Sequence, residues 1–99
     1  MSVVKLSMDH PLSQEGAVSV LNGLFSNGVI DDPLLSQLKI QRQGHVFTFA
    51  GVVKGFAIRG ALTIEERKLH GEIDFPWLAK PFQATAVKDI YAYLAKHLQ

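Results

Sequence analysis

The residues best suited to acid–base chemistry occupy alternate positions late in the chain. His70, Glu72 and Asp74 are separated by single residues, so on a β-strand all three would lie on one face. An imidazole beside carboxylates is a common arrangement for proton transfer. Arg59 would stand opposite Asp74 and form a cross-strand ion pair. Because nothing in the sequence implies a pocket or an oxyanion donor, an enzyme using these residues is an alternative, and we expect no catalytic residues.

The four histidines do not form a metal-binding motif. His10, His45, His70 and His97 show no HxxxH, HExxH or HxH spacing, and the chain has no cysteine. Short spacings of this kind, or thiolate ligands, are what identify metal sites in a sequence. We therefore expect no metal and no cofactor, and interpret the histidines as ordinary surface residues.

Neither a nucleotide nor a nucleic acid is an expected ligand. Gly51, Gly55 and Gly60 lie within predicted strands and their link, whereas a nucleotide-binding loop joins a strand to a helix. Their simplest role is in turns and tight sheet packing. Ten Lys and Arg oppose nine Asp and Glu, giving a net charge of +1 with the basic residues scattered. This balance gives no electrostatic reason to expect binding to nucleic acid or to an acidic membrane.

A β-hairpin over residues 55–75 is the element that would carry the polar cluster. Apolar residues occupy every second position on both sides of a charged turn at residues 65–68. Strict alternation of this kind is typical of an antiparallel hairpin with one buried face. The predicted pairs are Ile64–Leu69, Thr63–His70, Leu62–Gly71, Gly60–Ile73, Arg59–Asp74 and Ile58–Phe75.

A second hairpin is predicted just before the first. Residues 38–42 and 45–50 alternate in the same way and would join across Gln43-Gly44. The link over residues 51–55 is short, so the two hairpins would form one four-stranded meander. The predicted pairs in the second hairpin are Leu38–Phe49 and Ile40–Phe47.

Two amphipathic helices are predicted to flank the strands. Residues 14–26 place apolar side chains at three- and four-residue spacing after Ser13, a plausible N-cap. Residues 82–98 carry the clearer apolar stripe. Residues 1–12 are predicted to be an extended lead-in, and residues 31–37 a single turn opened by Asp31-Asp32-Pro33.

Two aromatic residues flank the turn between the sheet and the second helix. Trp77 and Phe82 lie on either side of it, and Pro76 and Pro81 interrupt the chain there. We expect both rings to close the end of the core. The alternative is an exposed apolar patch beside Lys80 that binds a hydrophobic surface.

These elements predict a single α+β domain over residues 1–99. It would be a four-stranded antiparallel meander with an N-terminal and a C-terminal helix packed on one face (α-β-β-β-β-α). Ninety-nine residues suit one domain, and a hydrophobic content of 47% lies in the globular range. The predicted inner face carries Leu38, Ile40, Phe47, Phe49, Phe56, Ile58, Leu62, Ile64, Leu69, Ile73 and Phe75.

The outer face of this sheet is the candidate binding surface. Its predicted centre consists of small residues, although a sheet face turned to water usually carries longer polar side chains. Plain solvent exposure is the ordinary explanation of such a face. Contact with a second copy or another partner is the functional one, because small residues allow a flat surface to approach closely. The candidate partner face consists of Val46, Thr48, Ala50, Ala57, Arg59, Ala61, Thr63, His70, Glu72 and Asp74.

The sequence predicts a soluble, cytoplasmic protein. Its first residues, MSVVKLSMDHP, lack the apolar core and cleavage site of a signal peptide. The longest apolar run, residues 47–53, is far shorter than the ~20 residues that span a bilayer. The absence of cysteine is compatible with a reducing compartment.

Two stretches resemble a bacterial family, the polyhydroxyalkanoic acid system proteins. The segment GALTIEERKLHGEIDFPWLAKPF, from Gly60, is similar to that family's glycine, two alternating strands, proline-containing turn and final helix. The opening HPLSQEGA, from His10, is similar to the family's start. The chain departs from the family in its longer glycine-rich link over residues 47–60 and in its nearly neutral charge. The resemblance implies a cytoplasmic accessory protein associated with polyester storage granules, with no catalytic residues to carry over.

Two functions other than the enzyme above are therefore expected. The first is a small non-enzymatic accessory protein that acts by protein association, in the setting of polyhydroxyalkanoate granule metabolism. The alternative is a small carrier or sensor that holds an acyl or other apolar ligand between the helices and the sheet. A cavity there on the order of several hundred Å³ would favour the carrier. A cleft that gathers His70 with a second titrating group would favour the enzyme.

Overall fold

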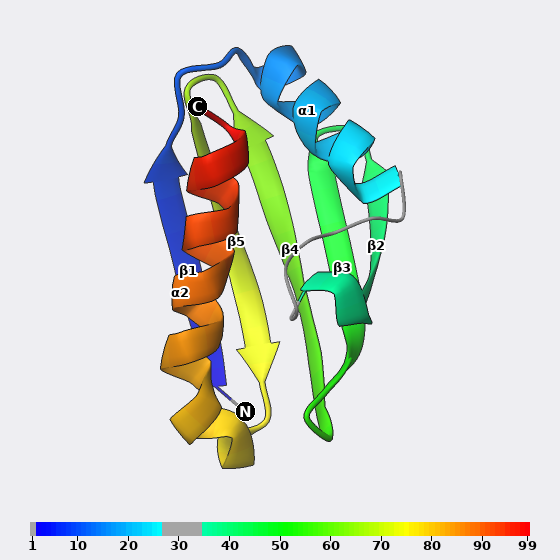
Figure 1. The fold of residues 1–99 in the computed structure, drawn as a ribbon, viewed down its shortest axis with the longest axis vertical. Coiled ribbons are helices and arrows are strands. Elements are labelled where there is room, and N and C mark those ends of the chain that lie inside the picture. Colours follow the sequence, from blue (N-terminus) through cyan, green and yellow to red (C-terminus); the bar gives the residue numbers. More distant parts are fainter. Residues whose placement is uncertain (1, 27–34) are drawn as a thin grey trace.

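In the computed structural model the chain forms one antiparallel sheet with two helices on the same side (Figure 1). The structure describes residues 2–26 and 35–99. This confirms the α+β class with two helices packed on one face. The strands are β1 (Ser2–Asp9), β2 (Leu38–Gln43), β3 (Val46–Val53), β4 (Phe56–Glu65) and β5 (Lys68–Phe75). The helices are α1 (Gln14–Ser26), α2 (Lys80–His97) and the 3-10 turns η1 (Leu35–Gln37) and η2 (Trp77–Ala79).

The predicted count of four strands is wrong, because the described residues contain five. The strand order is β1-β5-β4-β3-β2 with every neighbouring pair antiparallel. The additional strand is β1, which lies in the predicted lead-in. It pairs with β5 along its length, from Ser2 opposite Phe75 to Asp9 opposite Lys68. Strand β5 therefore has a neighbouring strand on each side, and its polar residues do not form the edge of the sheet.

The side chains of β1 show why this segment is a strand. Leu6 is buried and Val4 and Met8 are half-buried, whereas Lys5 and Ser7 are exposed. This two-residue alternation is the pattern of a strand with one face on the core. The pattern is present in the sequence, but its partner β5 lies 59 to 73 residues further along, and nothing within β1 identifies that partner.

The hairpin of β4 and β5 has the predicted register. Ile64 is opposite Leu69, and Thr63 is opposite His70. The ladder ends at the Arg59–Asp74 pair, so the predicted Ile58–Phe75 pair lies just beyond it.

The register predicted for β2 and β3 is wrong by two residues. Ile40 pairs with Phe49 and Leu38 with Gly51, because the two turn residues are Gly44 and His45. Gly44 has a φ of 63°, the positive value that suits the first position of a type II′ turn. A shift of two residues keeps every side chain on its predicted face.

The helices begin close to the predicted residues. The Oγ of Ser13 accepts a hydrogen bond of 3.0 Å from the backbone N–H of Gly16, so Ser13 caps α1. Helix α2 begins at Lys80, two residues earlier than predicted, since Pro81 is tolerated in the first turn. The turn predicted over residues 31–37 is a 3-10 turn at η1, and its proposed capping residues lie outside the described part of the chain.

The predicted inner face packs against both helices. Phe25 of α1 meets Phe47 edge-on, with ring centroids 5.4 Å apart, and stacks on Tyr93 of α2 at 6.5 Å. Ile40, Phe49 and Phe56 are half-buried, and the other predicted inner-face residues are buried. Burial of this surface is the main favourable contribution to folding.

Three glycines let neighbouring strands approach closely on the inner side. They are Gly51, Gly60 and Gly71, on β3, β4 and β5. A Cβ on Gly60 would lie 2.3 Å from the carbonyl oxygen of Glu72 and 2.7 Å from the ring of Phe49. A residue with a side chain therefore does not fit at Gly60, which allows the Phe49 ring to lie against the β4 backbone.

Candidate functional site

The helices leave the outer face of the sheet uncovered. Both helices lie on the opposite side (Figure 1). Each residue predicted for the partner face takes the outward position in its strand. Val46, Ala61, Thr63 and Asp74 are half-buried, and the remaining members of the face are exposed.

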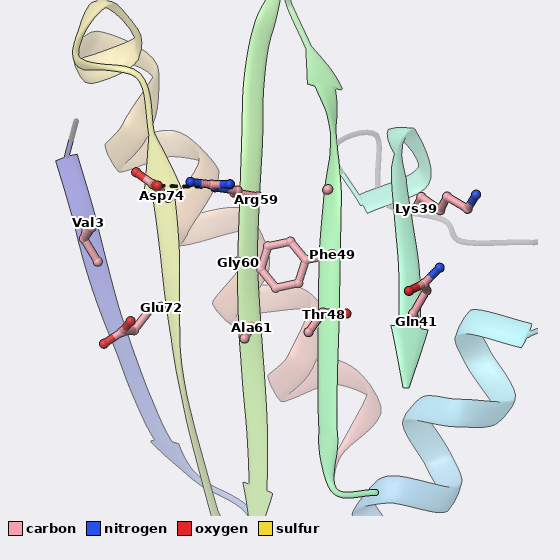
Figure 2. Close-up of a pocket in the computed structure, with 11 residues that line it drawn as sticks. Val3, Lys39, Gln41, Thr48, Phe49, Arg59, Gly60, Ala61, Glu72 and Asp74 are labelled. Carbon is pink, nitrogen blue, oxygen red and sulfur yellow. Dashed lines mark ion pairs between the residues drawn. The ribbon is translucent and has the colours of Figure 1, made fainter. Parts of the chain in front are cut away.

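A shallow hollow of about 520 Å³ occupies the centre of this face (Figure 2). Its centre consists of small residues on β3 and β4, namely Thr48, Ala50 and Ala61. Phe49 and Gly60 also line the hollow, while the Phe49 ring itself packs against the β4 backbone on the inner side of the sheet. The hollow is open and mostly apolar, so it suits a broad, flat contact better than a small buried ligand.

The margins of the hollow come from strands that the sequence did not identify as part of the face. Lys39 and Gln41 stand on β2 at one margin, and Val3 on β1 stands at the other. Glu72 and Asp74 on β5 lie on the same side as Val3. These flanking residues follow from the strand order, which local patterns do not determine.

A second open hollow of about 550 Å³ continues toward one end of the sheet. Ala50, Arg59 and Asp74 line both hollows, and Val52 and Pro76 line the second alone. The predicted Arg59–Asp74 ion pair is present, with Nε and Oδ2 3.5 Å apart. The Arg59 side chain is 72% exposed and that of Asp74 20% exposed, so the pair contributes at most about 1 kcal/mol.

The three residues considered for acid–base chemistry do not converge on a common point. His70 contacts Glu65, with Nε2 and Oε1 3.2 Å apart, while Asp74 pairs with Arg59. Neither hollow is lined by His70. Within residues 2–26 and 35–99, no group of three or more His, Asp or Glu side chains could hold a metal ion. This arrangement does not support the enzyme alternative.

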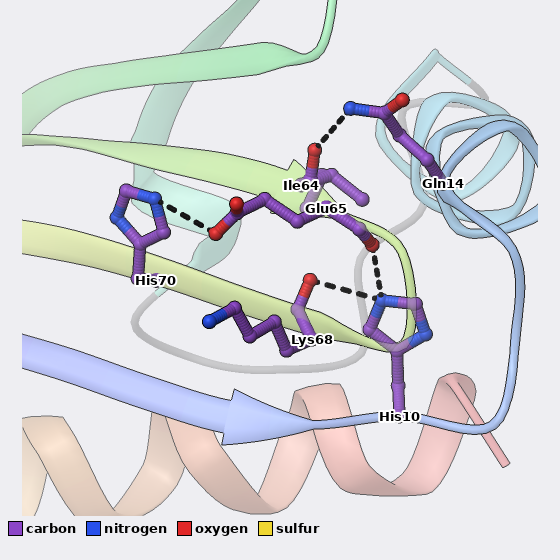
Figure 3. A network of polar contacts seen from close by, with 6 residues as sticks. All are labelled: His10, Gln14, Ile64, Glu65, Lys68 and His70. Atoms are coloured by element: carbon purple, nitrogen blue, oxygen red, sulfur yellow. Dashed lines mark hydrogen bonds and ion pairs between the residues drawn. The ribbon is translucent and has the colours of Figure 1, made fainter.

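The interpretation of His10 as a surface residue is wrong, because it is only 5% exposed. Figure 3 shows its contacts with the turn between β4 and β5. Its Nδ1 accepts a hydrogen bond of 3.1 Å from the backbone N–H of Leu12. The proton must then be on Nε2, which donates to the carbonyl oxygens of Glu65 at 3.1 Å and Lys68 at 3.2 Å. His10 thus ties the end of β1 to the turn between β4 and β5.

The residues after His10 hold the same turn. The backbone N–H of His10 donates to the carbonyl of Arg67, and the Arg67 N–H donates to the carbonyl of Leu12. The Gln14 side chain donates to the carbonyl of Ile64 at 2.9 Å (Figure 3), and the Gln14 N–H donates to Oε1 of Glu66 at 3.0 Å. These contacts give His10 and Gln14 structural roles that the sequence did not reveal.

The described residues of the helices and the sheet leave a small apolar gap between them. The apolar gap that we find there is about 20 Å³ and is bordered by Phe25, Phe47 and Leu94 among others. A gap of this size has room for about one water molecule. An acyl chain does not fit in this gap, so the described residues do not support the carrier alternative.

No protein-family model, curated protein or solved structure matches the chain. The resemblance to the polyhydroxyalkanoic acid system proteins therefore stays a prediction. None of the helices in the described residues is both long and apolar enough to cross a membrane.

Proposed function

We propose that this chain is a non-enzymatic association module that binds a second copy of itself through the outer face of the sheet. The observation that carries the proposal is the open hollow centred on Thr48, Ala50 and Ala61, where small side chains leave the sheet accessible. Antiparallel sheets with small residues outward pack well against another flat surface, since backbones can approach closely.

The distribution of charge across the hollow favours a second copy as the partner. Lys39 stands at one margin, and Glu72 and Asp74 stand on the opposite side (Figure 2). In a two-fold arrangement whose axis runs along the strands, the basic margin of one copy faces the acidic side of the other. The Arg59 side chain pairs with Asp74 but is largely exposed, so a carboxylate of the facing copy would meet it between the two margins.

The proposal is tested by placing a charge in the centre of the hollow. Ala50→Glu adds a carboxylate to an exposed position, so it should not disturb the fold but should oppose close packing of two sheets. We expect the dissociation constant of the dimer to rise at least about tenfold, measured by sedimentation velocity over a range of concentrations. Ala92→Glu is the matched control, because Ala92 is an exposed residue of α2.

Two outcomes would contradict self-association through this face. One is a wild-type chain that stays strictly monomeric at millimolar concentration. The other is a dimer that Ala50→Glu and Ala92→Glu weaken equally, since that result would place the contact elsewhere.

We also propose the biological setting that the family resemblance implies, a cytoplasmic accessory protein of polyhydroxyalkanoate granules. Its support is the pair of stretches beginning at His10 and Gly60. The test is the distribution of the chain between washed granules and the supernatant. We expect the wild-type chain to sediment with the granules. A chain found wholly in the supernatant would contradict this setting and would leave the proposal of self-association untouched.

A further inference from the structure

One end of the molecule exposes large apolar side chains. Trp77 and Leu78, adjacent on η2, are 69% and 63% exposed. The prediction that Trp77 closes the core is therefore wrong, whereas Phe82 is half-buried. The turn places Ala79 in the core, where its N–H donates to the carbonyl of Pro76.

The turn between β3 and β4 lies at the same end of the sheet (Figure 1). The Nζ of Lys54 in that turn sits 4.9 Å from the centroid of the Phe82 ring, which joins the turn to the start of α2. Val52 is 62% exposed and borders the second hollow together with Pro76. We call Val52, Trp77 and Leu78, with Lys54 and Lys80 beside them, the apolar tip.

We propose that the apolar tip binds the surface of an anionic lipid layer by shallow insertion of Trp77 and Leu78. Tryptophan is the side chain most suited to the boundary between hydrocarbon and water, because its ring is apolar and its N–H needs a polar partner. Flexible lysines beside such a ring keep their stems on apolar surface and their ammonium groups at the headgroups.

Charge at the tip favours anionic headgroups over a neutral surface. Lys54 and Lys80 are both exposed, and along α2 the first acidic residue after Lys80 is Asp89. Asp74, which lines the second hollow with Val52, is paired with Arg59. The whole chain carries a net charge of only +1, so the basic character is local. A local cluster is sufficient because the attraction to a charged lipid surface acts within about one Debye length.

The size of the patch suits shallow insertion into a lipid surface. Three exposed side chains of this kind present on the order of 400 Å² of apolar surface. Reversible anchoring at an interface needs only a few inserted side chains together with electrostatic attraction.

Trp77 is the only tryptophan of the chain, so its fluorescence reports directly on the tip. The probe is vesicles made of equal parts phosphatidylcholine and phosphatidylglycerol, compared with vesicles of phosphatidylcholine alone. We expect a blue shift of the emission and quenching by brominated acyl chains with the anionic vesicles, and a weaker response at high salt. Wild-type chain should float with these vesicles in a density gradient.

Substitutions separate the tip from the rest of the surface. Leu78→Asp should lower vesicle partitioning at least about tenfold while leaving Trp77 as the reporter. Val20→Asp is the control, because Val20 is also exposed but lies on α1. Lys80→Gln should weaken binding to the anionic vesicles and leave the weaker binding to neutral ones unchanged.

Several results would overturn the lipid-binding tip. The first is an unshifted emission with anionic vesicles at low salt. The second is partitioning that Leu78→Asp and Val20→Asp reduce equally. The third is a blue shift that grows with protein concentration in the absence of vesicles, because it would show that another protein molecule covers Trp77.

Discussion

Gly60→Ala should destabilise the fold strongly, because the added Cβ meets the backbone of the neighbouring strand. The Cβ would lie 2.3 Å from the carbonyl oxygen of Glu72, and 2.7 and 2.9 Å from two ring carbons of Phe49. Ordinary contacts begin near 3.4 Å, so the strand must move by about 1 Å and the ring by several tenths. Overpacking in a core costs about 1–3 kcal/mol, and a backbone contact belongs at the upper end of that range.

The expected loss is therefore about 3 kcal/mol, a large part of the total stability of a small domain. The midpoint of thermal unfolding should fall by about 10–25 °C, measured by circular dichroism. Phe49→Leu in the Gly60→Ala background should recover only part of the loss, because the contact with the Glu72 carbonyl remains. A double variant as stable as wild type would mean that the ring alone causes the effect.

Gly23→Ala is the matched control and should have the opposite sign. A Cβ at Gly23 meets nothing within 4 Å, and the residue lies inside α1. Alanine in a helix interior is favoured over glycine by about 1 kcal/mol, so the midpoint should rise. A Gly60→Ala variant within about 0.5 kcal/mol of wild type would refute the reasoning about close strand contact.

Three further substitutions test the core and the turn by urea unfolding. His10→Ala should cost about 2–4 kcal/mol, because it leaves buried backbone groups without partners, whereas His45→Ala at an exposed position should be nearly neutral. Equal effects of the two would remove the structural role of the buried imidazole. Arg67→Gly should stabilise the chain by about 0.5–1 kcal/mol, because Arg67 has a φ of 61°, which glycine adopts at lower cost, and its side chain is exposed. A loss of stability would show that the Arg67 side chain makes a stabilising contact. Ile73→Asp should prevent folding while Glu72→Ala stays within about 0.5 kcal/mol of wild type, and matching midpoints would contradict the assignment of faces.

The best-predicted elements are those in which the apolar alternation and the turn residues indicate the same register. In the hairpin of β4 and β5, two alternating runs flank four charged residues, 65–68, and this charged run places the turn and with it the register. The hairpin of β2 and β3 is less determined, because Gly44 can be either the first or the second residue of a tight turn. Both choices bury the same side chains, so alternation alone cannot separate them.

The features that the sequence did not reveal depend on distant contacts. Apolar and polar side chains alternate along β1 as in any strand, but its pairing with β5 is a long-range contact that this alternation does not determine. The burial of His10 depends on carbonyl oxygens at Glu65 and Lys68, more than 50 residues away. Trp77 is exposed because Ala79 takes the inward position in the short turn, and local composition does not distinguish these two outcomes.

The candidate partner face was predicted only in part, because its margins also depend on distant contacts. Its central residues, such as Ala50 and Ala61, follow from strand parity, which the sequence determines. Its margins at Val3 and Lys39 depend on which strands lie outermost, and that order is set by long-range pairing.

Self-association through the outer face is tested most directly by a distance measured across it. The chain has no cysteine, so a spin label on Thr48→Cys is unique and sits in the centre of the hollow. Sheets that pack face to face lie about 10 Å apart, so we expect strong dipolar coupling between two labels on the order of 10–20 Å apart. The same label on Ala92→Cys, on the far side of the molecule, should give a much longer distance. Absence of coupling at Thr48 in concentrated protein, or an equally short distance at Ala92, would contradict the proposed assembly.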